Sequence, residues 1–256
     1  MTPFRLEKWY LDVSDASPAA FIGYAAILRY RNIRIPYTGY TFFDGRSLKN
    51  RNSFRRHTIP EISNDTITLQ TPLVSGEWKR IDPPIQQILL KEDDRVIDWE
   101  CLMPKASTTV SVDGRTISGL GYAEKITLTF MPWKLPIKEL HWGRFLSIDI
   151  AVIWIKWIGQ HPKDVVFFNG REMQNPRIAK SEIAFETFSL VLTEAATLRE
   201  GKVGSTVFKN VPATARLFPS SILSLDENKW LSDGKLFAGN SLVATGHAVH
   251  EVVIWK

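Results

Sequence analysis

Polar and apolar residues alternate along much of this chain, which is the pattern of strands with one buried face. The segment Lys125-Ile-Thr-Leu-Thr-Phe130 alternates strictly. Since successive side chains of a strand point to opposite faces, this period of two predicts β-structure. β-Branched and aromatic residues, which favour strands, are prominent in the same segments. We predict further strands over residues 66–70, 108–112, 187–193 and 202–208.

Turn signals separate these segments, and helical periodicity is scarce. Four Asp-Gly or Asn-Gly pairs are typical of tight hairpin turns: Asp44-Gly45, Asp113-Gly114, Asn169-Gly170 and Asp233-Gly234. Short helices are expected only around residues 181–185 and 220–228. The pattern therefore predicts a predominantly antiparallel β protein, with its sheets closed into barrels.

The chain also contains a weak internal repeat. Laying residues 116–128 on residues 243–255 matches Gly119 with Gly246 and Glu124 with Glu251, 127 positions apart. A second match, 133 positions apart, sets Trp9 on Trp142. Two prolines near residues 130–136 interrupt strand pairing between the halves. We therefore predict two domains, residues 1–132 and 133–256.

The alternation of side chains along two predicted strands places a glutamate on an apolar face of each. One face of the strand that ends the first half carries Tyr122 and Glu124 among apolar residues, so Glu124 is expected to point inward. The same phase in the second half places His247 and Glu251 among apolar residues. A carboxylate removed from water is costly unless it is paired, hydrogen-bonded or protonated. Arg144, the charged residue on an apolar face that we expect to run from Leu140 to Trp154, is a candidate partner.

Several segments in order resemble the hydroxyneurosporene synthase and AttH-like group of double-lipocalin proteins. They are Glu7-Lys-Trp-Tyr-Leu-Asp12, Phe21-Ile-Gly-Tyr24, Trp99-Glu-Cys-Leu-Met-Pro104, Gly119-Leu-Gly-Tyr-Ala-Glu124, Leu140-His-Trp-Gly-Arg-Phe145 and His250-Glu-Val-Val-Ile-Trp255. The resemblance spans most of the chain. It implies an all-β fold of two consecutive lipocalin-like (calycin) antiparallel β-barrels with a tunnel for a ligand.

Members of this group include carotenoid 1,2-hydratases and cofactor-free cyclases of polyene natural products. The hydratases carry a His- and Asn-rich extension of the Gly-x-Gly-Tyr motif, whereas this chain has Ala123-Glu124-Lys125-Ile126 there, which puts carotenoid hydration in doubt. Lipocalin-type barrels also commonly close one end with a tryptophan packed on an arginine. Trp142 and Arg144 fit that purely structural role, with Glu124 as a counter-ion.

Composition narrows the functional classes. The single cysteine, Cys101, lies in an apolar run and is expected to be a core residue. The net charge of +5 is spread along the chain except in residues 46–57, and no nucleic-acid-binding motif accompanies that basic patch, so a solvated loop is expected. His247 and His250 would point to opposite sides of a strand, which argues against zinc. No segment is typical of a signal peptide or a membrane span, and we expect a cytoplasmic protein.

These observations leave two main hypotheses. The first is a cofactor-independent enzyme that cyclises, isomerises, protonates or hydrates a small hydrophobic terpenoid- or polyketide-like polyene. Glu124 would be the acid or anchor, Tyr122 and Arg144 would support it, and Glu251 and His247 would be their second-half equivalents. Trp9, Tyr24, Trp142 and Trp255 would contact the ligand. The second hypothesis is a non-catalytic carrier with the same cavity. Neither needs a metal, a cofactor, a nucleic acid or an integral membrane segment.

Overall fold

The computed structural model is almost entirely β-structure and divides into two compact units, Met1–Leu135 and Pro136–Lys256. It describes residues 4–17, 19–54, 58–209, 215–216 and 218–255. We call the two parts unit 1 and unit 2 and describe each by itself.

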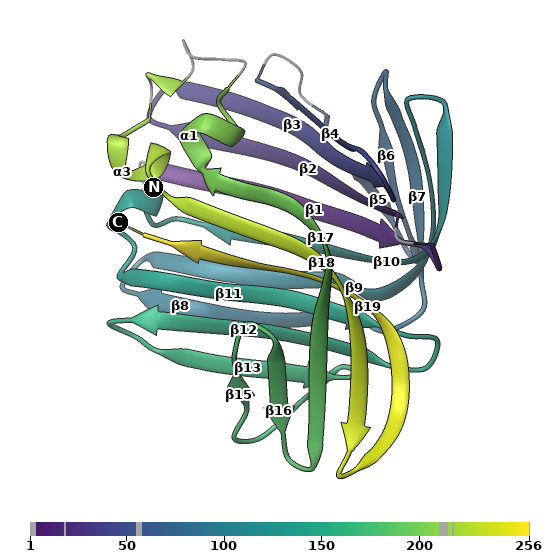
Figure 1. Cartoon of the computed structure of the whole chain (residues 1–256). Helices are drawn as coiled ribbons and strands as arrows, with labels where there is room; N and C mark the ends of the chain where they lie inside the picture. Colours follow the sequence, from purple (N-terminus) through teal and green to yellow (C-terminus); the bar gives the residue numbers. More distant parts are fainter. Residues whose placement is uncertain (1–3, 18, 55–57, 210–214, 217, 256) are drawn as a thin grey trace. The chain divides into compact units, whose positions relative to one another are not determined.

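Unit 1 contains one antiparallel sheet in which the first strand pairs with both the second and the last. Its main path is β4-β3-β2-β1-β10-β9-β7-β6-β5, and β8 pairs with β9 (Figure 1). The strands are β1 (Phe4–Ser14), β2 (Ala19–Tyr30), β3 (Ile33–Asp44), β4 (Leu48–Ser53), β5 (Glu61–Ser63), β6 (Thr66–Gln70), β7 (Val74–Arg80), β8 (Ile85–Glu92), β9 (Arg95–Val112) and β10 (Arg115–Leu128).

Unit 2 follows the same path, β14-β13-β12-β11-β19-β18-β17-β16-β15. A short 3₁₀ helix, η1 (Pro132–Lys134), precedes it. Between β17 and β18 the described residues include the single-turn helices α1 (Val203–Thr206) and α3 (Ser220–Leu223). Its strands are β11 (Ile137–Leu146), β12 (Ala151–Gly159), β13 (Lys163–Phe168), β14 (Arg171–Glu172), β15 (Arg177–Ile178), β16 (Glu182–Phe185), β17 (Phe188–Lys202), β18 (Asp226–Ala238) and β19 (Ser241–Ile254).

Each sheet curls into a half-barrel around its own apolar core, which confirms the predicted all-β, lipocalin-like class. In unit 1 the core cluster includes Leu11, Phe21, Trp78 and Ala123. In unit 2 it includes Phe145, Trp154, Leu190 and Ala248. Alternate residues of each strand supply these clusters, as the pleat requires.

Most of the predicted turns form where the sequence placed them, and one does not. Asp113-Gly114 and Asn169-Gly170 both have positive φ at the two residues, as in hairpin turns. Asp233-Gly234 instead lies inside β18. A Cβ at Gly234 would come within 2.5 Å of the Phe145 ring, so this glycine is needed for close packing and not for a turn.

Three predicted elements were wrong in type or extent. Within residues 181–185, where a helix was expected, Glu182–Phe185 form strand β16, and residues 202–208 contain helix α1 where a strand was expected. The helix predicted over residues 220–228 ends at Leu223, before β18 begins at Asp226. In each case the segment is short, so tertiary packing overrides its local periodicity.

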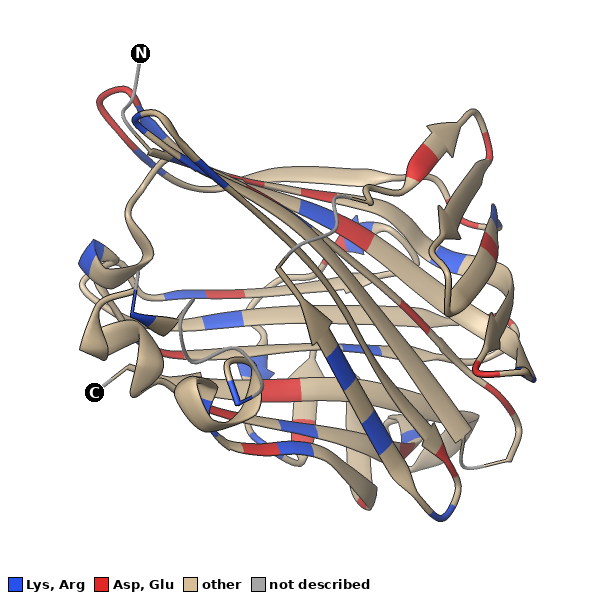
Figure 2. Cartoon of the chain, turned by 90° about the horizontal axis from the view of Figure 1, so that it is seen from above, with Lys and Arg blue, Asp and Glu red and all other residues tan. Residues whose placement is uncertain are grey.

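Acidic and basic residues are interspersed on the strands of both units, as Figure 2 shows. This distribution agrees with the even spread of charge in the sequence. Among the described residues, we find no helix with the length and apolar character that a membrane span requires.

Candidate functional site

Glu124 is the acceptor of two short hydrogen bonds in unit 1. Tyr122 Oη and Trp99 Nε1 each donate to Glu124 Oε2 over 2.6 Å. Trp99 and Tyr122 are buried, and Glu124 is partly buried. Because both contacts are donations, an ionised carboxylate fits this geometry.

The strand register surrounds Glu124 with further polar and aromatic side chains. Tyr10 lies opposite Glu124 in the β1–β10 ladder, and Asp12 lies opposite Tyr122. Asp12 is fully buried and accepts a 2.9 Å hydrogen bond from Tyr10 Oη. The Tyr10 ring makes an edge contact with Tyr24 at 5.6 Å between centroids. We call Tyr10, Asp12, Tyr24, Trp99, Cys101, Tyr122 and Glu124 the Glu124 cluster.

Burial controls the ionisation of two members of this cluster. It raises the pKa of the Tyr122 hydroxyl, and the charge of Glu124 adds to the effect. Tyr122 therefore stays protonated and remains a hydrogen-bond donor at neutral pH. Burial also raises the pKa of the Cys101 thiol, so Cys101 is a packed, unreactive thiol, as its apolar surroundings predicted.

The structure corrects the expected orientation of the two glutamates. Ala123 belongs to the core cluster of unit 1, and Ala248 belongs to that of unit 2. Side chains an odd number of residues apart lie on opposite faces of a strand. Glu124 is one residue from Ala123 and Glu251 is three residues from Ala248, so both glutamates face away from the curled interiors. The apolar pattern was ambiguous because both faces of β10 are buried around residues 122–123.

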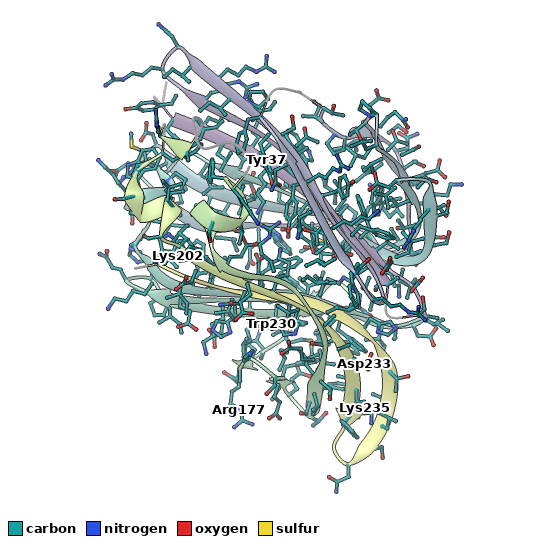
Figure 3. The ribbon with its side chains drawn as sticks, turned by 45° about the horizontal axis from the view of Figure 1, so that its top comes forward. Tyr37, Arg177, Lys202, Trp230, Asp233 and Lys235 are labelled. Carbon is teal, nitrogen blue, oxygen red and sulfur yellow. The ribbon has the colours of Figure 1, made fainter. Side chains whose placement is uncertain are left out.

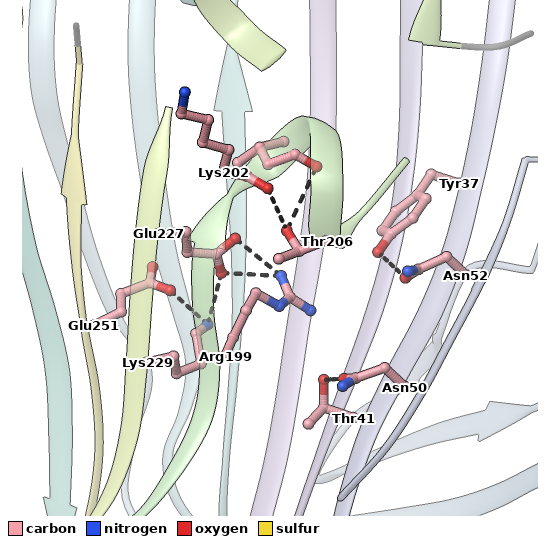
Figure 4. A network of polar contacts seen from close by, with 11 residues as sticks. Tyr37, Thr41, Asn50, Asn52, Arg199, Lys202, Thr206, Glu227, Lys229 and Glu251 are labelled. Atoms are coloured by element: carbon pink, nitrogen blue, oxygen red, sulfur yellow. Dashed lines mark hydrogen bonds and ion pairs between the residues drawn. The ribbon is translucent and has the colours of Figure 1, made fainter. Parts of the chain in front are cut away.

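In unit 2, Glu251 belongs to a chain of ion pairs. Lys229 Nζ lies 2.5 Å from Glu251 Oε2 and 3.8 Å from Glu227 Oε1, and Arg199 Nη1 donates to both carboxylate oxygens of Glu227 at 3.0 Å (Figure 4). Lys229 is only 2% exposed. Two cations and two anions balance one another here, which indicates a structural role.

Arg144 and its neighbours differ from the expected arrangement. The chain turns between β11 and β12, so Arg144 lies opposite Ile153 and not on the face of Trp154. Arg144 is fully buried, and its Nη1 donates to the carbonyl of His247 at 3.0 Å. The His247 ring itself lies 3.2 Å from the exposed Asp233.

The four predicted ligand contacts fall in different surroundings. Trp9 packs in the core cluster of unit 1, on the face opposite Tyr24. Trp142 is buried, with Lys229 Nζ 5.9 Å from its ring centroid. Trp255 follows β19, and its backbone N–H donates a 2.9 Å hydrogen bond to the carbonyl oxygen of Lys138. Of these four residues, Tyr24 alone is a member of the Glu124 cluster.

Unit 1 also contains a cavity of about 400 Å³ on its core side. Its apolar lining includes Phe21, Leu69 and Val74, and its polar lining includes Tyr40 and Arg51. Burial and the nearby carboxylate of Asp113, which accepts a 3.0 Å hydrogen bond from Tyr40 Oη, raise the pKa of Tyr40 to about 12. The size and lining fit a small, mostly apolar ligand.

Unit 2 has a polar pocket of about 480 Å³ that the sequence analysis did not identify. Glu139, His141, Lys180, Glu194, Thr197, Glu200, Asn228, Trp230 and Val252 line it, and we call it the unit 2 pocket. Trp230 lies on β18, three residues before Asp233 on the opposite face (Figure 3). The sequence offered one signal for this pocket, the phase of β19. It places His250, one residue before Glu251, on the opposite face, and His250 contacts the ring of the pocket residue Trp230 at 5.3 Å between centroids.

Part of the basic patch lies within the described residues and contributes to an ion pair and to the unit 1 cavity. Arg55, Arg56 and His57 of the patch lie outside the described residues, whereas Lys49 pairs with Asp113 at 3.6 Å and Arg51 lines the unit 1 cavity. Within the described part of the chain, no group of three or more His, Cys, Asp or Glu side chains is placed to hold a metal ion.

Comparison with known proteins gives no match to a family model and none to a curated sequence. Solved structures do match. An AttH-like protein from Nitrosomonas europaea has a TM-score of 0.61 at 9% identity, covering 98% of this chain and 93% of that one. The structure of CghA with Sch210972 has a TM-score of 0.62 at 10% identity, covering 99% of this chain and 89% of that one. Kievitone hydratase from Nectria haematococca has a TM-score of 0.57 at 6% identity, covering 98% of this chain and 89% of that one.

These likenesses extend over nearly the whole chain and confirm the double-lipocalin-like fold that the sequence motifs indicated. At 10% identity or less they concern the fold and not the reaction.

Proposed function

We propose that this chain is a cofactor-independent enzyme that acts on a small hydrophobic molecule of the terpenoid or polyketide type. The observation that carries the proposal is the pair of 2.6 Å hydrogen bonds that hold Glu124 Oε2 within a wall of buried aromatic rings. The fold supports it, because one structural neighbour is a hydratase and another was crystallised with a small molecule.

The proposed chemistry uses Glu124 as a base or as a fixed negative charge. Cyclisation or isomerisation of a polyene through a cation develops positive charge on carbon and ends with the loss of a proton. In hydration of a conjugated double bond, the carboxylate takes a proton from the attacking water and returns it to the substrate carbon. A carboxylate held by Tyr122 and Trp99 stabilises such positive charge without reorganising, and Tyr10 and Tyr24 add two aromatic rings, in edge contact with each other, to the same cluster. Two hydrogen bonds to one oxygen favour this role over the general acid that the sequence suggested.

A non-catalytic carrier is the second candidate, and the unit 1 cavity favours it. A cavity of about 400 Å³ with Phe21, Leu69 and Val74 in its lining suits storage of an apolar molecule. Glu124 is not among the residues that line this cavity. A carrier would therefore bind its ligand without using the Glu124 cluster.

The test is incubation of the purified protein with a hydrophobic metabolite extract of its source organism, followed by mass spectrometry over time. We expect one component to be converted, either to an isomer of equal mass or to a product heavier by one water. Glu124→Gln should slow this conversion by about a hundredfold, because the fixed negative charge is removed while the shape is kept.

Glu100→Gln is the matched control, since Glu100 is a partly buried glutamate of the neighbouring strand that pairs with Lys125 at 3.0 Å. Its turnover should equal that of the wild type. Equal turnover by Glu124→Gln would remove Glu124 from the mechanism. Stoichiometric capture of a component that returns unchanged on denaturation would show a carrier.

A further inference from the structure

We propose that the unit 2 pocket is a second binding site, made of residues other than those of the Glu124 cluster, and that it takes a small organic ammonium ion. The pocket has a volume of about 480 Å³ and is formed by strands β11, β17, β18 and β19 together with Lys180. This size accommodates a small organic molecule. Its residues play no part in the function proposed above.

The charge of the pocket favours a cation. Three glutamates, Glu139, Glu194 and Glu200, line it, against one lysine, Lys180. Such a surplus of carboxylates attracts positive ligands and repels anions. The imidazole of His141, with its Nε2 2.6 Å from Glu139 Oε1, holds one of these carboxylates in place.

Trp230 provides the place where the cation sits. Lys180 Nζ lies 4.2 Å from the centroid of the Trp230 ring, which is the geometry of a cation–π contact. The ring is buried beside His250, the residue opposite it on β19, and His250 shares a 2.8 Å hydrogen bond with the buried Ser232. Trp230 is thus fixed, whereas Lys180 is exposed and carried on the segment between β15 and β16.

Lys180 is therefore an internal occupant of the site. Its ammonium group shows that the Trp230 face accepts a positive charge, and a ligand ammonium would take the same position. Glu194, which accepts a 2.7 Å hydrogen bond from Thr197, and Glu200 would then face the ligand's N–H groups. Since Lys180 and the ligand compete, removal of the lysine amine should strengthen binding.

The experiment is calorimetric titration of the full-length protein at low salt with putrescine, 1,4-butanediol and succinate, which share a four-carbon length and differ in charge. We expect putrescine to bind at one site per chain and the other two to give no binding. Lys180→Met should tighten putrescine binding by about tenfold, because the internal competitor for Trp230 is lost. Glu200→Gln should weaken it by about threefold to tenfold.

Lys235→Met, which removes the same charge from an exposed position of β18, is the control and should leave the affinity unchanged. A Lys180→Met variant that binds putrescine no more tightly than the wild type would overturn the proposal. So would binding of succinate or of the diol with equal affinity. Lys180, Glu200 and Lys235 are exposed, so we expect all three variants to fold like the wild type. An unchanged thermal unfolding temperature verifies this.

Discussion

At the scale of single residues, the sequence predicts which side chains of β10 share a face but not which face is interior. The sequence correctly places Glu124 and Tyr122 on one face of a strand, and the structure joins them by a 2.6 Å hydrogen bond. It does not show which face is interior, because Tyr122 and its neighbour Ala123 are both buried. Where both faces of a strand are buried, apolar alternation carries no information about direction.

His250 makes the stability of the protein depend on pH. Burial lowers the pKa of His250 to about 4, below the ordinary histidine value of 6.5. The unfolded chain therefore binds a proton more readily between these two values, and stability falls as the pH drops from 6.5 towards 4. Between pH 7.5 and pH 4.5 this one group should cost about 2.5 kcal/mol of unfolding free energy.

Urea unfolding of the wild type and of His250→Gln at the two pH values measures this contribution. The variant should lose about 2.5 kcal/mol less than the wild type over that interval, because glutamine does not titrate. His161→Gln, at an exposed loop histidine, should behave like the wild type. The same loss in His250→Gln and in the wild type would contradict the assignment.

At the scale of elements, strand existence was more predictable than strand ends. Residues 66–70 form β6 as predicted, since the alternation there ends at clear turn signals. The apolar run from Leu140 to Trp154 was expected to be one continuous face. The chain turns at residues 147–150, where Ile148 is 85% exposed, and this turn changes the phase between Arg144 and Trp154. Because Ile148 at this turn is apolar, the sequence pattern showed no break between the two strands.

Gly234 shows how an element is fixed by packing. Its absent Cβ leaves room for the fully buried ring of Phe145, whose Cδ2 and Cε2 atoms would lie 2.5 and 2.6 Å from an added methyl carbon. Gly234→Ala should therefore destabilise the protein by about 1–3 kcal/mol, because the core must shift to admit the methyl group.

Chemical denaturation gives the value, and Lys235→Ala at the adjacent exposed position should change it by less than about 0.5 kcal/mol. If Gly234→Ala is as stable as the wild type, the ring of Phe145 is not held in the position described.

For the whole molecule, the repeat in the sequence reflects a real repeat of strand order, but its alignment needs adjustment by one residue. The sequence aligned Trp9 with Trp142. In the sheets, Tyr10 lies opposite Glu124 and Trp142 lies opposite Glu251, so Tyr10 is the counterpart of Trp142. A shift of one residue reverses the face, which explains why Trp9 belongs to the core cluster of unit 1 while the buried Trp142 is not a member of the core cluster of unit 2.

In each unit, the first and last strands are hydrogen-bonded neighbours, β1 with β10 and β11 with β19. A segment that enters and leaves at adjacent positions can be copied in tandem without threading one copy through the other. Gene duplication followed by divergence accounts for such a chain. Unit 1 has a largely apolar cavity and unit 2 a pocket rich in carboxylates, as expected when selection acts on each half without rebuilding its partner.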